Sequence, residues 1–282
     1  MSKSRHFDRS GSRSETRSGE TRFSTKAASQ STPIRPRDLL RPTTHPIHPF
    51  DQIHSTDTSG LVPARDLATG HPNDEHVTAY YGVAPSILRS LVEQWIATAP
   101  LHHITDYTFL DIGAGKGRAV LLASEFPFRQ IIGVELNPAM AAIAQSNADI
   151  WHRAHASDPT ASATAPIRIL QDDALNIDLP PTPTLVFLFH PFEDPVLKAL
   201  LRRIETAFAE HPGTLDLLYV NAEHGATLDR HPAFSLLWQG QIPMSPEDHA
   251  ADLEAIAQQQ EYGSTGDELC AVYRYAGRGR KR

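Results

Sequence analysis

Three glycines at alternating positions, Gly113, Gly115 and Gly117, mark the stretch of this sequence with the clearest chemical meaning. They follow the mainly apolar residues 109–112, which predict a buried strand, and precede residues 118–126, which predict a helix. Glycine is needed where the backbone must turn tightly or approach a ligand more closely than a Cβ allows. A helix that begins after such a loop points free N–H groups back over it. Strand, glycine loop and helix together predict a nucleotide-binding site.

The spacing of the glycines argues against two common kinds of nucleotide site. A dinucleotide fingerprint has its third Gly or Ala three residues after the second, and Arg118 stands at that position here. A P-loop needs a Gly-Lys-Ser/Thr triplet, whereas Gly117 follows Lys116. The spacing therefore disfavours a nicotinamide-dependent oxidoreductase, although tight binding of NAD(H) would support that function. The carboxylate of Asp111 would be unfavourable beside a pyrophosphate and favourable beside a cationic ligand.

The surrounding sequence alternates between strand and helix patterns, which predicts an α/β fold with a doubly wound parallel sheet. The predicted strands are 109–112, 130–135, 167–171, 184–189 and 214–220, and the predicted helices are 86–96, 118–126, 137–152 and 194–209. Two further strands, 234–239 and 269–275, lack a helix-length crossover of the usual pattern, so we expect them to form an antiparallel pair at one edge. Residues 245–260 between them are predicted to be a helical insertion.

Residues 111–118 resemble the first motif of class I S-adenosylmethionine-dependent methyltransferases. The resemblance covers residues 77–275. It implies a Rossmann-like, doubly wound sheet of seven strands, mostly parallel with an antiparallel C-terminal strand pair. It also implies an enzyme that uses S-adenosyl-L-methionine as its cofactor and transfers the methyl group to an acceptor that the sequence does not identify. An amine of a protein or of a small molecule is the favoured acceptor.

Further residues of this sequence match the cofactor site of that family. Glu135, at the end of the second strand, stands where the family places the acid that binds both ribose hydroxyls. Asp173 matches the aspartate that accepts a hydrogen bond from the adenine amino group, with Asp172 as a direct competitor. The cofactor-binding residues implied in this way are Asp111, Gly113, Gly115, Gly117, Glu135, Asp173 and His190. No metal is implied. The alternative for Asp111 and Glu135 is that both merely cap strand ends.

The fourth strand ends in His190-Pro191-Phe192, at the position that faces the transferred methyl group in that family. Amino-methylating relatives often carry Asn/Asp-Pro-Pro-aromatic there. The shorter form here resembles the Asn-Pro-Phe of a bacterial subgroup and, more distantly, the histone-lysine methyltransferases that lack a SET domain. His190 is the candidate catalytic base, or else a residue that shapes the pocket. Pro191, Phe192 and Tyr81 are the candidate substrate-binding residues. Tyr80 and Tyr81 form either a lid over the cofactor or a surface pair that anchors the following helix.

Composition divides the chain into an N-terminal region, residues 1–74, a methyltransferase-like domain, 75–276, and a basic tail, 277–282. Residues 1–45 carry ten Lys or Arg against four Asp or Glu, a net charge of +6, so the remainder carries −13 of the total of −7. We expect this basic part to be disordered and the Pro- and His-rich residues 42–74 to be a solvated linker. The acidic remainder argues against nucleic-acid binding except through the basic arm.

The single cysteine, Cys270, excludes an internal disulfide and fits a reducing compartment. The sequence has no run of about 18 apolar residues, so no membrane span is predicted. A cytoplasmic protein is therefore expected. The sequence leaves a second function open, which is a non-catalytic cofactor-binding module that retains the methyltransferase fold. The unusual His190 motivates this alternative.

Overall fold

The computed structural model describes residues 46–156, 165–257 and 266–278. The predictions for residues 1–45 and 279–282 lie outside the described residues. Within the described part, the chain alternates between strands and helices from residue 85 onwards. No helix there is long and apolar enough to cross a membrane.

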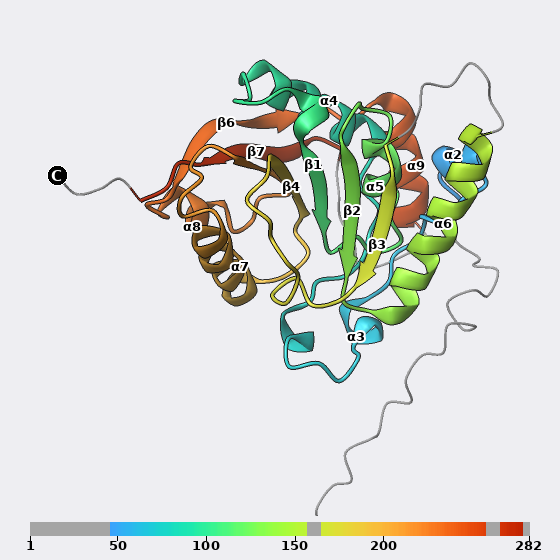
Figure 1. Cartoon of the computed structure of the whole chain (residues 1–282). Coiled ribbons are helices and arrows are strands. Elements are labelled where there is room, and N and C mark those ends of the chain that lie inside the picture. The colour runs from blue at the N-terminus through green and yellow to red at the C-terminus, as the bar shows by residue number, and fades with distance from the viewer. Residues whose placement is uncertain (1–45, 157–164, 258–265, 279–282) are drawn as a thin grey trace, which may run out of the picture. The chain divides into compact units, whose positions relative to one another are not determined.

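Seven strands form one mixed sheet in the order β3-β2-β1-β4-β5-β7-β6 (Figure 1). Their bounds are β1 Thr108–Ile112, β2 Gln130–Glu135, β3 Ile167–Gln171, β4 Thr184–Phe189, β5 Leu215–Val220, β6 Phe234–Ile242 and β7 Glu268–Tyr275. Strands β1 to β5 pair in parallel, whereas β7 is antiparallel to both β5 and β6. The predicted doubly wound sheet with an antiparallel C-terminal pair is confirmed.

Alternate side chains of the strands pack on opposite faces of the sheet, which gives the protein two apolar cores. The helices that cover one face are α4 Pro85–Ala97, α5 Arg118–Ala123 and α6 Pro138–Ala156, and those on the other face are α7 Asp194–Ala207 and α8 Gly225–Asp229. On β1, Phe109 belongs to the first core, whereas Leu110 belongs to the second. The predicted insertion forms helix α9, Pro246–Ala257.

The folded part begins earlier than the sequence indicated. Residues 46–76 form two short helices, α2 Pro49–His54 and α3 Ala64–Leu67, and the 3-10 turn η1 Asp74–His76. Helix α2 starts in the usual way, because the Nδ1 atom of His48 accepts a hydrogen bond from the backbone N–H of Phe50 and proline occupies the first turn. The side chain of Phe50 is buried in the first core. The predicted domain boundary at residue 75 therefore lies inside the folded unit, and residues 46–74 are not a solvated linker.

Two cationic side chains, one within the glycine loop and one directly after it, hold this N-terminal segment in place. The Nζ atom of Lys116 donates to Oδ1 of Asp57 and to the carbonyl oxygen of Ser59, both at 2.8 Å. The Nε atom of Arg118 donates to the hydroxyl of Thr58 at 2.7 Å. Both cations are almost fully buried, so these polar partners offset the cost of removing their charges from water. Lys116, which sits where a phosphate-binding loop would have its lysine, is thus a structural residue.

Candidate functional site

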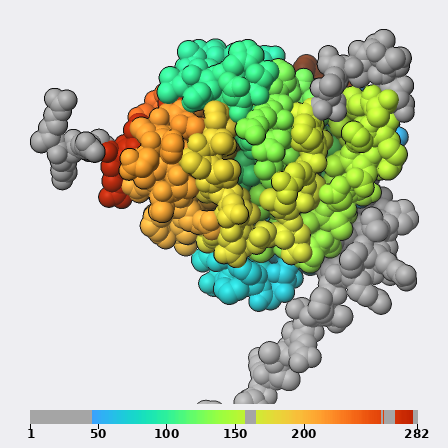
Figure 2. Space-filling model, in the orientation of Figure 1, coloured from blue at the N-terminus to red at the C-terminus, as the bar shows by residue number. Residues whose placement is uncertain are grey.

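A pocket lies at the carboxyl ends of β1, β2, β3 and β4, where parallel sheets of this type bind ligands. Residues 77–83 form its roof, together with Leu67 and Asn73 from the N-terminal segment. The empty space, including the part open to solvent, is about 950 Å³. In the space-filling view the cyan residues of the N-terminal segment lie directly against the green and yellow parts of the domain (Figure 2). The residues that the sequence analysis left outside the domain therefore help to enclose its pocket.

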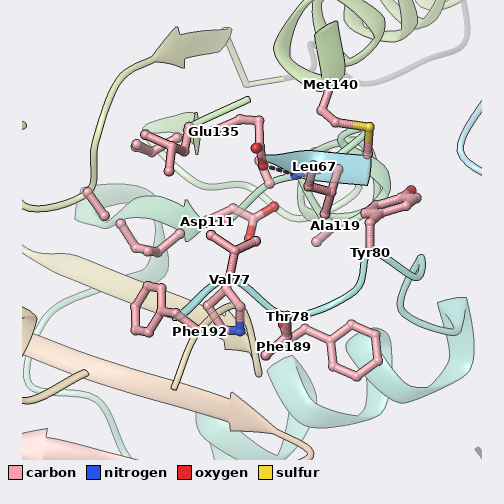
Figure 3. A pocket seen from close by; sticks show the side chains of 18 of the residues that line it. Leu67, Val77, Thr78, Tyr80, Asp111, Ala119, Glu135, Met140, Phe189 and Phe192 are labelled. Carbon is pink, nitrogen blue, oxygen red and sulfur yellow. Dashed lines mark hydrogen bonds between the residues drawn. The ribbon is translucent and has the colours of Figure 1, made fainter. Parts of the chain in front are cut away.

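The neighbouring carboxylates of Asp111 and Glu135 are among the acidic side chains that line this pocket (Figure 3). Asp111 is only 3% exposed, and its carboxylate has no hydrogen bond or ion pair with any residue that the structure describes. Burial and the neighbouring Glu135 raise the pKa of Asp111 to about 8. Burial also raises the pKa of Glu135 above its ordinary value. A buried acid and a partly buried acid, with no cation of the described residues between them, favour a cationic ligand or one with several hydrogen-bond donors.

The carboxylate of Glu135 also supports the backbone of the site. Its Oε2 atom accepts the backbone N–H of Gly115 at 2.7 Å, and its Oε1 atom accepts that of Asn137 at 2.8 Å. A carboxylate can accept about four hydrogen bonds, so both oxygens keep a free lone pair. The side chain thus does cap the loop and the start of α6, as the structural alternative supposed, and it still has the capacity to bind two hydroxyl groups.

The three predicted glycines have different neighbours. A Cβ on Gly113 would overlap the Pro191 side chain, and a Cβ on Gly115 would overlap the ring of Tyr80. Both glycines also line the pocket. Gly117 does not; it precedes α5 with φ 88° and packs against Ala144 of α6, whose Cβ would be 3.2 Å from a Cβ on Gly117. The alternating glycines are therefore required at least as much by close contacts within the protein as by a ligand.

Asp172 and Asp173, the two candidates for the adenine-binding aspartate, differ in their contacts. Both line the pocket. The Oδ1 atom of Asp173 accepts the backbone N–H of Leu175 at 2.8 Å, and its Oδ2 atom accepts from the side-chain amide of Asn73 at 3.2 Å. Asp172 is exposed and accepts only the backbone N–H of Asp173. Asp173 is therefore the better-oriented acceptor of the two.

His190 does not lie where the sequence analysis expected it, which was beside the transferred methyl group. It does not line the pocket, although its neighbours Phe189 and Pro191 do. Its φ angle is 40°, in the left-handed region that non-glycine residues rarely adopt, so the chain turns sharply at the end of β4. The Nε2 atom lies 3.4 Å from the Glu223 carboxylate, and the ring centroid lies 5.2 Å from that of His224. The side chain thus faces the end of β5, and the structure does not bring it together with the predicted cofactor-binding residues.

The backbone of the same motif is engaged by the roof. The hydroxyl of Thr78 donates to the carbonyl oxygen of His190 at 2.5 Å, and the backbone N–H of Thr78 donates to that of Pro191 at 3.4 Å. Val77 forms a bridge with Phe192 beside them. Pro191 and Phe192, two of the predicted substrate-binding residues, line the pocket. Sequence reasoning missed Thr78, because a lone threonine before two tyrosines carries no motif.

Both roof tyrosines line the pocket, and each is tied to a different segment. The hydroxyl of Tyr80 donates to the carbonyl oxygen of Thr58 at 2.7 Å, and the hydroxyl of Tyr81 donates to Asp252 of α9 at 2.6 Å. The pair is thus part of the pocket wall, which matches the lid prediction more closely than the prediction of a surface pair. Sequence reasoning missed the participation of α9, whose residues showed no pattern beyond a helix.

The part of the pocket next to β4 is apolar. Its lining there includes Val83, Phe187, Phe189, Phe192 and Val196. Figure 3 shows Phe189 and Phe192 on the same side as Val77 and Thr78, away from Leu67 and Met140. The pocket therefore has a polar part near the carboxylates and an aromatic part near the end of β4. Among the described residues, no group of three or more His, Cys, Asp or Glu side chains is placed to hold a metal ion.

Comparisons with known proteins show only distant likenesses. No protein-family model matches the chain, and no curated protein sequence matches it. Among solved structures, it resembles the YcgJ protein from Bacillus subtilis, with a TM-score of 0.41, 14% identity, and 68% of this chain and 99% of that chain covered. The putative RNA methyltransferase PH1948 from Pyrococcus horikoshii gives 0.42 and 12%, with 68% and 83% covered. Magnesium protoporphyrin IX methyltransferase from Synechocystis PCC 6803, solved with bound SAM, gives 0.41 and 13%, with 67% and 78% covered.

Proposed function

We propose that this protein binds S-adenosylmethionine in the pocket and transfers its methyl group to an acceptor. The observation that carries the proposal is the pair of neighbouring acids, buried Asp111 and partly buried Glu135, with no protein cation between them in the described part of the chain. S-adenosylmethionine has a sulfonium and an ammonium group at one end and a ribose diol in the middle. Its charge would offset the desolvation that raises the pKa of both acids.

The residues present fit this ligand without further cations. Asp111, near the carboxyl end of β1, lies beside the glycine loop, where a carboxylate favours the cationic end of the ligand. Glu135 at the end of β2 keeps one free lone pair on each oxygen for the ribose hydroxyls. Asp173 at the end of β3 offers Oδ2 to the adenine amino group. These three acids lie at or just after the carboxyl ends of three adjacent strands, so one extended ligand can reach all of them.

When bound, the cofactor supplies a methyl group on a positively charged sulfur, with a neutral thioether as the leaving group. The contribution of the protein is then to orient the methyl group toward an acceptor and to exclude water. The aromatic part of the pocket, with Phe187, Phe189 and Phe192, would surround the acceptor. Because His190 faces away from the pocket, we propose that it shapes the turn after β4 and is not the base.

Thr78 already donates hydrogen bonds at the position where the methyl acceptor would bind. In the amine-accepting interpretation, backbone carbonyls of the His190-Pro191-Phe192 segment would accept hydrogen bonds from the target nitrogen. Here Thr78 occupies the carbonyl oxygen of His190 through its hydroxyl and that of Pro191 through its backbone N–H. Each of these carbonyl oxygens has a second lone pair, so an amine acceptor would have to share them with Thr78 or displace it.

The same contact favours a second function, a cofactor-binding module that does not catalyse methyl transfer. In that case Thr78 would keep the acceptor position closed. The test is to incubate the protein with S-adenosylmethionine and panels of amines, lysine peptides and hydroxyl compounds, and to measure S-adenosylhomocysteine. Product formation that the Asp111→Asn variant loses supports the transferase. Cofactor binding without turnover in any panel, in both wild type and Thr78→Val, supports the binding module.

A further inference from the structure

We infer that Asn73, in the N-terminal segment, is a specificity residue for the adenine ring. Its side-chain amide oxygen would accept the second hydrogen of the exocyclic amino group while Asp173 accepts the first. The inference rests on the proposed function, because it names a contact to the same ligand. Asn73 is not one of the acids at the strand ends, and it belongs to no sequence motif.

The carboxylate of Asp173 accepts hydrogen bonds from the protein and can still accept another from a ligand. Its Oδ1 atom accepts the backbone N–H of Leu175 at 2.8 Å, whereas Oδ2 faces side chains of the N-terminal segment, with Nε2 of His71 at 3.6 Å. The Nδ2 atom of Asn73 donates to that same Oδ2 at 3.2 Å, and the Asp173 side chain is only 13% exposed. An oxygen that accepts one hydrogen bond at this distance can accept a second.

Only one orientation of the Asn73 amide forms a hydrogen bond with Asp173. A carboxylate accepts hydrogen bonds and cannot donate them, so the NH₂ group must face Asp173 and the oxygen must face away from it. Within the described residues, the Oδ1 atom of Asn73 accepts no hydrogen bond, although Asn73 lines the pocket. Asp173 Oδ2 and Asn73 Oδ1 therefore form two neighbouring acceptors. The amino group of adenine carries two hydrogens, which matches two acceptors placed side by side.

The turn that carries Asn73 is rigidly built. The Oδ2 atom of Asp74 accepts the backbone N–H groups of Thr69, Gly70 and His71 at 2.7, 2.6 and 3.0 Å. The backbone N–H of Asn73 donates to Nδ1 of His71 at 3.2 Å, which leaves the ring proton on Nε2, 3.6 Å from Asp173 Oδ2. A network of this kind fixes the position of the side chain before any ligand arrives, and preorganisation reduces the entropic cost of binding.

The other end of the roof is also fixed. Two residues after η1, Thr78 donates to the carbonyl oxygens after β4, and the backbone N–H of Glu193 donates to the carbonyl oxygen of His76. The roof thus runs from the end of β3 to the end of β4, with Asn73 at the β3 side. This places Asn73 over the same part of the pocket as Asp173, where the proposed adenine ring would lie.

The experiment measures the dissociation constants of S-adenosylhomocysteine and of its N6-methyladenine analogue by calorimetry. The proteins are wild type, Asn73→Ala, and Glu75→Ala as a matched control on the same turn, because the Glu75 side chain is 79% exposed and does not line the pocket. Loss of one hydrogen bond predicts about tenfold weaker binding of S-adenosylhomocysteine by Asn73→Ala. The wild type should prefer the unmethylated ligand by about tenfold, and Asn73→Ala should lose most of this preference. Glu75→Ala should behave as wild type.

Three outcomes would overturn the inference in different ways. Unchanged affinity and preference in Asn73→Ala would remove Asn73 from adenine recognition while leaving the proposed function intact. Tighter binding by Asn73→Ala would show that Asn73 competes with adenine for Asp173 as a latch. Absence of S-adenosylhomocysteine binding by the wild type would reject the proposed function together with the inference. Thermal unfolding of the three proteins shows whether a loss of binding reflects a loss of folding.

Discussion

The carboxylate of Glu135 adds to burial in raising the pKa of Asp111 to about 8, because the two acids share one pocket and no described cation neutralises them. At neutral pH, the Asp111 carboxyl group of the ligand-free protein is therefore mostly protonated. A cationic ligand would favour its ionised form. The charge state of this residue thus couples ligand binding to pH.

This coupling predicts that S-adenosylmethionine binds more tightly as the pH rises from about 6.5 to 8.5. Below the raised pKa, the carboxyl group must lose a proton before it can attract the cationic end of the ligand, so binding at pH 7 should release a proton. Calorimetry at several pH values, in buffers with different ionisation enthalpies, measures both effects. An affinity independent of pH, without proton release, would contradict the role given to Asp111.

The same pKa predicts a change in stability when Asp111 is replaced by Asn. A carboxyl whose pKa is higher in the folded state than in the unfolded state stabilises the fold fully at low pH, and this contribution is lost as the pH rises to about 8. Asp111→Asn removes the ionisable group without changing its shape. The ligand-free variant should therefore be more stable than wild type at pH 9, by roughly 1–3 kcal/mol, and less different at pH 5. Equal thermal unfolding curves at pH 9 would count against the buried, unpaired carboxylate.

A substitution at Gly115 should disrupt the pocket for steric reasons. A Cβ there would overlap the Tyr80 ring, and φ at this residue is 54°. We expect Gly115→Ala to displace Tyr80 and to weaken cofactor binding by tenfold or more. Gly70→Ala is the matched control, since its φ is 88° and a Cβ would meet nothing within 4 Å. Because Gly70 belongs to the turn that carries Asn73, the control is compared by thermal unfolding, which reports the cost of backbone strain. Unchanged cofactor binding by Gly115→Ala would contradict the steric role of this glycine.

A buried acid that does not line the pocket, Asp216, connects β5 to β7 and to α4. The carboxylate of Asp216 on β5 is fully buried and accepts two hydrogen bonds from Arg274 on β7, at 2.7 and 3.0 Å, and one from the indole of Trp95 on α4, at 2.8 Å. Asp216→Ala leaves the Arg274 cation buried without its partner. The free energy of unfolding should fall by about 3–5 kcal/mol, measured by denaturant titration. A fall below 1 kcal/mol would mean that Arg274 finds water instead.

The sequence alone was sufficient to predict the sheet, because apolar runs and helical periodicity are local signals. The glycine loop and the strand-end acids Asp111, Glu135 and Asp173 were found from residue type and position. All three lie at the pocket. What these residues do within the protein was harder to predict: Gly117 packs against α6, and Glu135 caps two backbone N–H groups.

The fold of the N-terminal segment was missed because its stability comes from contacts that are distant in sequence. Residues 46–74 are rich in Pro and His and have few apolar side chains, so their composition predicts a linker. Their burial depends on Lys116 and Arg118, about 60 residues away along the chain. The orientation of His190 was equally hidden, because a positive φ at the end of β4, and not the residue type, directs the side chain toward Glu223.

The most direct test of the central claim is calorimetric titration of the full chain with S-adenosylmethionine and with NAD⁺. We predict binding of one S-adenosylmethionine per chain, at least tenfold weaker binding by Asp111→Asn and Glu135→Gln, and no comparable binding of NAD⁺. Glu135→Gln should keep the fold, because its amide oxygen can still accept one backbone N–H. Binding of NAD⁺ in preference to S-adenosylmethionine, or no binding of S-adenosylmethionine by the folded wild type, would contradict the account.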